Sequence, residues 1–296
     1  MIAKNFKIIL TIFFIFFTFE VKSKNIYSND FNSKDLSNYF SGVISYNNQK
    51  NEQALKYFKS SKQLLNKHEE YFKRLIFSLV LNQNVDRAIQ EIKFLRNKNQ
   101  SKFFEAQLLL LIDSINKKNF DKTKIYLNNI AKYTEEGTFE KIIYETIRDY
   151  SFTFEEKKMS NFKSNFGNLT AINNAFQSCY LNNPNTLEYF DILKNSEAAD
   201  YSRYLFFYTN YLTHKKRFDL VKEISLEIDE LSSNLIILQT KSWIDKSRFN
   251  EIKEIFSCKN ENDLLAEFFY LVSNLYSSQD EYEESNFYLN ISYFLN

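Results

Sequence analysis

Glycine, proline and cysteine are scarce in this 296-residue sequence, which contains 3 Gly, 1 Pro and 2 Cys. So little glycine and proline leaves few of the turns that β-hairpins need, which disfavours an all-β fold. Gly42, Gly137 and Gly167 lie far apart, and this excludes a glycine-rich phosphate-binding loop or a dinucleotide-binding fingerprint. Helices joined by short polar turns remain as the expected architecture.

Metal-ligating and nucleophilic side chains are also few. His68 and His214 lie in charged breaks between helices, where we expect solvated side chains, and no zinc-ligand spacing is present. Cys179 and Cys258 could pair in an exported protein, but the sequence favours free, buried thiols. Adjacent carboxylates such as Glu69-Glu70 are expected on solvated helix faces. We therefore expect no catalytic residue, no metal and no cofactor.

Aromatic residues are abundant, with 31 Phe and 20 Tyr, while the chain is 44% hydrophobic and 25% charged. These overall proportions are those of a folded globular protein, so extended disorder is not expected. We interpret the aromatic residues as core residues rather than as a base-stacking surface. A formal net charge of +1 gives no electrostatic reason for binding nucleic acid or an anionic membrane.

The N-terminus has the pattern of a secretory signal peptide. Two lysines precede a 12-residue apolar stretch, Ile8–Phe19, and Ser23 supplies a small residue for cleavage. The stretch is short for a membrane span. We expect residues 1–23 to be a signal peptide and residues 24–33 to be a flexible lead-in. An uncleaved anchor is the alternative, because a glutamate and a lysine lie close to the cleavage site.

Three successive pairs of helices are predicted in residues 34–132, where apolar residues recur every three or four positions. Short turns rich in Asn, Gln and Lys separate the two helices of each pair. Corresponding residues of the first two pairs are 34 positions apart, and the third pair follows after one added residue. The corresponding positions are Ala54 and Ala88, Phe58 and Ile92, and, in the third pair, Thr123 and Leu127.

A helix–turn–helix period of 34 residues resembles the tetratricopeptide repeat family. Gly42 falls at the small position of that family's first helix, and Ala54 falls at the small position of its second helix, with Phe58 at the aromatic position. The resemblance implies an all-α fold in which antiparallel helical hairpins stack into a superhelical solenoid. Small residues let the two helices of a repeat approach, and large apolar residues fill the space against the next repeat.

The middle of the chain, residues 133–199, loses the 34-residue register and is predicted to be an irregular helical segment. Met159–Gly167 is expected to be a loop. Asn183-Pro184 is expected to start a helix, because asparagine is a good cap and proline is tolerated in the first helical turn.

The register returns in residues 200–296, where further repeats are predicted. In the last pair, Ser273 and Ser285 replace the small glycine or alanine of the family. The sequence ends on apolar residues, whereas terminal repeats usually carry a polar outer face. This end predicts either a truncated array or a surface that docks on another molecule.

The resemblance also implies a concave groove lined by the first helix of each repeat. Aromatic side chains there would anchor a peptide or an amphipathic helix, and basic side chains would contact carboxylates. The alternative is that some of these residues, such as Tyr39 and Leu108, pack between repeats. The residues placed in the groove are Tyr39, Val43, Tyr46, Lys73, Arg74, Phe77, Leu108, Ile112 and Asn116.

These patterns predict a non-enzymatic scaffold, exported to the periplasm or envelope of a bacterium, that binds a peptide or a partner protein in the groove. One alternative is an accessory subunit of polysaccharide or cell-wall export that binds glycan or a synthase. Another is an enzyme whose catalytic part follows Asn296 or lies within residues 133–200. We expect no nucleic-acid partner and no small-molecule substrate. Membrane contact is expected only through an uncleaved signal or a membrane partner.

Overall fold

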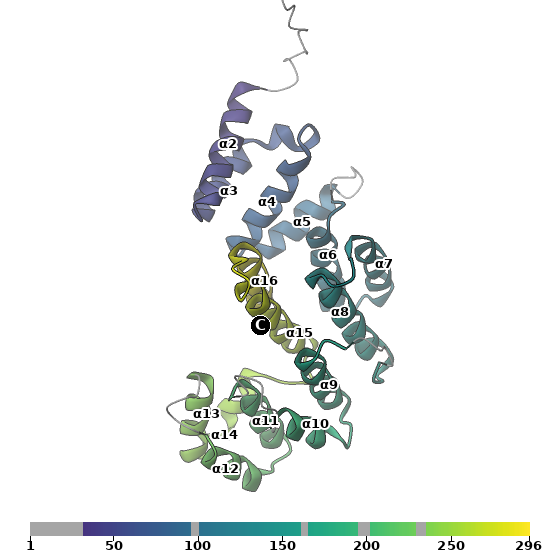
Figure 1. Cartoon of the computed structure of the whole chain (residues 1–296), viewed down its shortest axis with the longest axis vertical. Coiled ribbons are helices and arrows are strands. Elements are labelled where there is room, and N and C mark those ends of the chain that lie inside the picture. The colour runs from purple at the N-terminus through teal and green to yellow at the C-terminus, as the bar shows by residue number, and fades with distance from the viewer. Residues whose placement is uncertain (1–31, 96–100, 161–164, 195–201, 229–234) are drawn as a thin grey trace, which may run out of the picture.

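The computed structural model describes residues 32–95, 101–160, 165–194, 202–228 and 235–296. In these ranges all regular elements are helices, which pack mainly against their neighbours in sequence (Figure 1). The prediction of an all-α solenoid of helical hairpins is therefore confirmed. The expected signal peptide and nearly all of the expected lead-in lie outside the described residues. No described helix is both long and apolar enough to cross a bilayer.

Within the described residues, seven helical hairpins and one unpaired helix, α8, follow one another. The short 3-10 helices η2 (Lys62–Asn66) and η4 (Ala131–Tyr133) extend α3 and α7. The α-helices are α2 (Ser33–Asn47), α3 (Asn51–Ser60), α4 (Glu69–Leu81), α5 (Val85–Leu95), α6 (Phe104–Asn116), α7 (Phe120–Ile130), α8 (Phe139–Glu156), α9 (Asn168–Leu181), α10 (Thr186–Lys194), α11 (Ser202–His214), α12 (Phe218–Leu226), α13 (Leu235–Asp245), α14 (Phe249–Ile255), α15 (Glu261–Ser277) and α16 (Tyr282–Leu295).

One type of turn closes successive hairpins and explains how the chain folds with so little glycine. Gln49 and Gln83, 34 residues apart, have left-handed φ angles of 58° and 59°. In each turn the next N–H donates to a carbonyl five residues earlier, at 2.9 Å in both cases, which is a Schellman closure. The same geometry recurs at Lys118, Lys216 and Ser247. A non-glycine residue in this conformation costs about 1–2 kcal/mol, which the repeated packing must offset.

Small residues lie where the two helices of a hairpin cross. A Cβ atom on Gly42 would lie 2.8 Å from Cε1 of Phe58, so this glycine is required by the ring that packs against it. Ala54 and Ala88 are fully buried at equivalent places, four residues after the ends of their turns. Ser273 and Ser285 are buried, and their hydroxyls are 3.2 Å apart. Of the other predicted packing residues, Ile92 and Thr123 are buried and Leu127 is partly buried.

Two sequence-based expectations need correction, and one helix begins later than expected. Cys179 of α9 and Cys258, just before α15, form a disulfide with a Cα–Cα distance of 5.9 Å, so the preference for free thiols was wrong. The Asn183 side chain accepts a hydrogen bond from the Asn185 N–H at 2.9 Å, as expected of a cap, but the regular part of α10 begins at Thr186. His68 is not a solvated loop residue: its ring lies 4.6 Å from the ring of Tyr39, and its Nδ1 is buried.

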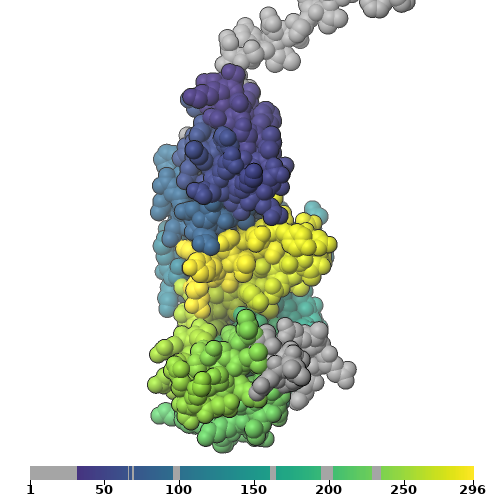
Figure 2. Space-filling view, turned by 90° about the vertical axis from the view of Figure 1, so that its left-hand side faces the viewer, coloured from purple at the N-terminus to yellow at the C-terminus, as the bar shows by residue number. Residues whose placement is uncertain are grey.

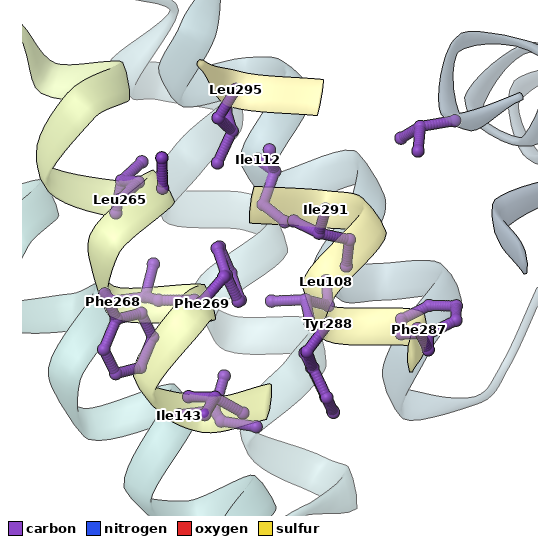
Figure 3. Packing of buried hydrophobic residues seen from close by; sticks show 14 of the residues in the cluster. Leu108, Ile112, Ile143, Leu265, Phe268, Phe269, Phe287, Tyr288, Ile291 and Leu295 are labelled. Carbon is purple, nitrogen blue, oxygen red and sulfur yellow. The ribbon is translucent and has the colours of Figure 1, made fainter. Parts of the chain in front are cut away.

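The α15–α16 hairpin folds back onto helices that precede it in the chain. Helices α2–α8 form a curve, and this hairpin lies inside the curve instead of extending the stack (Figure 1). The α16 helix contacts α4 and α5, and α15 contacts α8. Figure 2 shows the outer side of the hairpin, in yellow, exposed between the purple N-terminal repeats and the green helices. Its inner side belongs to the hydrophobic core (Figure 3).

Candidate partner-binding groove

The concave face predicted to bind a partner is occupied by the chain's own C-terminal hairpin. Four of the predicted groove residues contact α15 or α16 directly: Tyr46, Arg74, Phe77 and Asn116. The groove therefore holds a helical hairpin of the same chain, whereas the sequence predicted a peptide or a partner protein there.

A polar cluster joins α16 to the first two repeats. The Tyr46 hydroxyl donates to the Glu283 carboxylate, and an Arg74 guanidinium nitrogen lies 3.7 Å from the same carboxylate. The guanidinium also lies over the Tyr46 ring, 5.0 Å from its centroid. Burial, followed by the hydrogen bond to Glu283, raises the pKa of Tyr46 above its ordinary value. The phenol therefore remains a hydrogen-bond donor at neutral pH.

An aromatic contact lies beside this polar cluster. The rings of Phe77 on α4 and Phe287 on α16 are stacked with centroids 4.6 Å apart, and both side chains are buried. The ammonium group of Lys73 lies 5.5 Å from the Phe77 centroid and 3.7 Å from the Glu105 carboxylate. Lys73 therefore pairs within the N-terminal repeats and does not contact a carboxylate of the hairpin.

The remaining groove residues pack in the core. Tyr39 lies among aromatic rings that include Phe58 and Tyr71, and Val43 packs against the same core. Leu108 and Ile112 are fully buried in the cluster that the hairpin completes (Figure 3). For Tyr39 and Leu108 the structure thus has the packed arrangement that the sequence left as the alternative.

Charge complementarity accompanies this packing. Residues 260–296 contain 7 of the chain's 37 acidic residues and none of its 38 basic residues, so residues 1–259 carry a net charge of +8. Three carboxylates of the hairpin form ion pairs with basic side chains in the rest of the chain. Glu283 pairs with Arg74, Glu267 pairs with Arg203, and Glu261 lies 3.5 Å from Lys118 and 3.9 Å from Lys157.

The Arg203–Glu267 pair is the most deeply buried of these contacts. Arg203 donates from Nε and Nη2 to the two carboxylate oxygens of Glu267 at 2.7 and 2.5 Å, and its guanidinium lies 4.1 Å from the Tyr270 ring centroid. Burial nevertheless raises the pKa of Glu267, although Arg203 opposes this effect. A bidentate, buried pair fixes the orientation of α15 against α11, and removal of one partner would leave an uncompensated charge.

Two partly buried carboxylates lie under the hairpin, Glu105 on α6 and Glu284 on α16. Burial raises the pKa of Glu105, Lys73 opposes this shift, and Glu140 adds to it. Burial also raises the pKa of Glu284, and the charges of Glu283, Glu281 and Glu105 raise it further. Glu105 Oε2 is buried and has no hydrogen-bond partner in the described part of the chain. Hairpin docking therefore has an electrostatic cost at this point.

The base of the hairpin is fastened to α9. Beside the disulfide, the Lys259 ammonium donates to the backbone carbonyls of Cys179 and Tyr180 at 2.5 and 2.6 Å. The Tyr180 hydroxyl donates to Glu261 at 2.8 Å. Burial, together with the charge of Lys215, lowers the pKa of Lys259 to about 8. These contacts hold the first turn of α15 beside α9.

The position of the α15–α16 hairpin in the groove was not predicted from the sequence. The 34-residue spacing predicts that each helix pair stacks on the previous one, and it does not indicate that a pair can fold back into the groove. The residues it missed are Glu261, Glu267, Glu283 and Phe287. One signal was present in the sequence: the last 37 residues contain no lysine or arginine, while the predicted groove contains Lys73 and Arg74. Opposite charge on two segments of one chain is a reason to expect that they meet.

The outward face of α16 remains open. Tyr282, Leu289 and Tyr293 are spaced by 7 and 4 positions, which places them on one side of a helix, and they are 52%, 42% and 68% exposed. Asn286 lies on the same side and is also exposed. Asp280 and Glu281, both exposed, flank this face at the start of α16. We call Tyr282, Asn286, Leu289 and Tyr293 the α16 outer face.

Within the described ranges, no group of three or more His, Cys, Asp or Glu side chains is arranged to hold a metal ion. Comparison with known proteins does not assign the chain to a family. The sequence matches no protein-family model, and no curated protein sequence matches it.

Proposed function

We propose that this chain is a non-enzymatic protein-interaction scaffold of the tetratricopeptide kind, exported to the bacterial envelope. Stacked hairpins with small residues at their crossings and turns 34 residues apart support the repeat assignment. The Cys179–Cys258 disulfide supports export, because disulfides persist in oxidising compartments such as the periplasm.

The partner surface that we propose is the α16 outer face rather than the groove. The hairpin fills the groove with buried residues such as Phe287, Tyr288 and Ile291, so a partner bound there would have to displace part of the core. The exposed tyrosines and leucine of the α16 outer face are the single observation that carries this proposal.

The partner segment that fits this face is a helix with an apolar stripe flanked by basic residues. Residues three, four and seven positions apart form the ridge against which such a helix packs. Large aromatic side chains such as Tyr282 and Tyr293 are frequent anchors of protein interfaces. The exposed Asp280 and Glu281 would attract basic side chains and repel acidic ones.

A photo-crosslinking amino acid placed at Leu289 in the full chain tests this proposal in envelope preparations. We expect one discrete protein adduct from Leu289, and none from the same amino acid placed at Ile125 on α7, which is similarly exposed. Equal labelling from both positions, or no adduct from Leu289, would contradict the proposed surface. Adducts that form only from groove positions such as Val43 would instead favour partner binding in the groove.

Glycan binding by an accessory subunit of cell-wall or polysaccharide export is the second candidate function. It is favoured by one specific observation, an amide-lined cavity whose wall includes Tyr282 and Asn286 of the α16 outer face.

A further inference from the structure

A cavity of about 220 Å3 lies at the seam between the C-terminal hairpin and the first two repeats. Its walls come from the end of α2, the turn to α3, the first residue of α3, the last residue of α4 and the first turns of α16. It therefore exists only when the hairpin is docked. Pockets for drug-sized ligands enclose about 300–1,000 Å3, so this smaller cavity has room for a single ring-sized group.

Four side-chain amides line the cavity: Asn47, Gln49, Asn51 and Asn286. None of these amides is hydrogen-bonded to another residue in the part of the chain that the structure describes. The Schellman turn, in which Gln49 has a φ of 58°, fixes the backbone that presents Asn47, Gln49 and Asn51, while Asn286 is presented by α16. Each amide offers two donors and an acceptor, so together they can bind a ligand whose groups donate and accept at once.

The charged groups of the lining are already compensated. Glu283 is the only ionisable carboxylate in the wall, and it is held by the Tyr46 hydroxyl and by Arg74. The lining contains no lysine or arginine that could bind a phosphate or a free carboxylate. The chemistry of the cavity thus disfavours ionic ligands of either sign and favours an uncharged polar ligand.

An apolar platform completes the site. The Tyr282 ring is 52% exposed at the rim, and its hydroxyl donates to Asp280 Oδ1 at 2.6 Å, which restricts the ring. Leu81 contributes a further apolar surface. Pyranose sugars combine these two requirements, because their hydroxyls both donate and accept while their C–H faces lie on aromatic rings.

We propose that this cavity is a binding subsite for one uncharged sugar residue, at the end of a glycan or along it. The proposal rests on the second candidate function, glycan binding, and requires no protein partner. Since the walls come from both ends of the chain, a bound sugar would stabilise the docked hairpin in proportion to the logarithm of its concentration over Kd.

Full-length protein applied to an array of neutral and anionic glycans tests the proposal, followed by titration of a bound neutral oligosaccharide. We expect binding of neutral glycans, and at least a tenfold increase in Kd for Asn51→Ala, Asn286→Ala and Tyr282→Ala. Asn290→Ala on α16 and Tyr57→Ala on α3 are matched controls outside the cavity and should change Kd less than twofold. Circular dichroism of each variant verifies that the helices are intact.

Three outcomes would overturn the sugar subsite. These are absence of binding to neutral glycans, binding confined to anionic glycans, and cavity variants that bind as well as the two controls. Asn51 lies off the α16 outer face, so Asn51→Ala should leave the crosslinks from Leu289 unchanged. Failure of the subsite and failure of the protein-docking proposal are thereby distinguished.

Discussion

Phe77 of α4 stacks on Phe287 of α16 with the ring centroids 4.6 Å apart, and this contact joins the α4–α5 hairpin to the α15–α16 hairpin. Both rings are buried, so truncation of either would leave a cavity between the groove and the hairpin. We expect Phe287→Ala to lower the free energy of unfolding by about 3–5 kcal/mol. Urea denaturation measures this change. Phe94→Ala, which truncates a largely exposed phenylalanine, is the matched control and should cost less than about 0.5 kcal/mol.

At the crossing of α2 and α3 we expect an added methyl group, rather than a removed side chain, to destabilise the protein. A Cβ on Gly42 would lie 2.8 Å from Phe58, so Gly42→Ala should cost about 1–3 kcal/mol by overpacking. Thermal unfolding measures the loss. Phe58→Leu combined with Gly42→Ala should cost less than the two single changes added together. Strict additivity would show that the glycine is not required by this ring.

Reduction of the Cys179–Cys258 disulfide should destabilise the protein substantially. The bridge closes a loop with a sequence separation of 79 residues, and loss of that constraint from the unfolded chain costs about 4.5 kcal/mol in the chain-entropy account. Urea midpoints with and without a reductant measure the effect, and Cys179→Ala with Cys258→Ala should reproduce the reduced value. An unchanged midpoint would mean that the bridge is not formed in solution.

The burial of the Asp149 carboxyl on α8 leads us to expect that the stability of the protein depends on pH. Burial raises the pKa of this carboxyl to about 7, with Arg148 opposing and Glu145 adding to the shift, and its Oδ1 is buried without a partner among the described residues. A raised pKa in the folded state means that stability is gained on protonation and lost as the pH rises through 7. Wild type should therefore lose stability relative to Asp149→Asn between about pH 4 and pH 7.

Denaturant titrations of both proteins across that range measure the difference. The difference in the free energy of unfolding should change by no more than about 1.4 kcal/mol per pH unit, which is the limit for one proton. Because Asp149 is only partly buried, solvent screening should make the measured change smaller than this limit. Asp245→Asn, at an exposed helix end, controls for loss of a charge. A difference that does not vary with pH would contradict the buried-carboxyl account.

The local architecture was largely predictable because its causes are local. Helix bounds, the polar turns and the small residues Gly42 and Ala54 follow from periodicity and from steric limits within a single hairpin. Burial of Leu108 was harder to assign, since the same side chain can line a groove or pack beneath a neighbour. The choice depends on what covers the groove, which repeat spacing does not encode.

The hairpin in the groove could not be derived from repeat spacing, because it depends on contacts between residues more than 200 positions apart, such as Tyr46 with Glu283. Pairing of the cysteines was unpredictable for the same reason: their separation of 79 residues places no limit on their distance in space. The docked hairpin and the disulfide both depend on how the chain folds back onto earlier helices. In each case the deciding interaction is tertiary and nonlocal.

Zero-length carbodiimide crosslinking of the unmodified protein tests whether the C-terminal hairpin is docked on the N-terminal helices in solution. Lys118 Nζ lies 3.5 Å from Glu261 at the start of α15, and Lys124 Nζ lies 2.6 Å from Glu155 within the N-terminal helices as an internal control. Mass spectrometry of the digested monomer should detect both crosslinked peptides. Detection of the Lys124–Glu155 peptide without the Lys118–Glu261 peptide would contradict the docked hairpin.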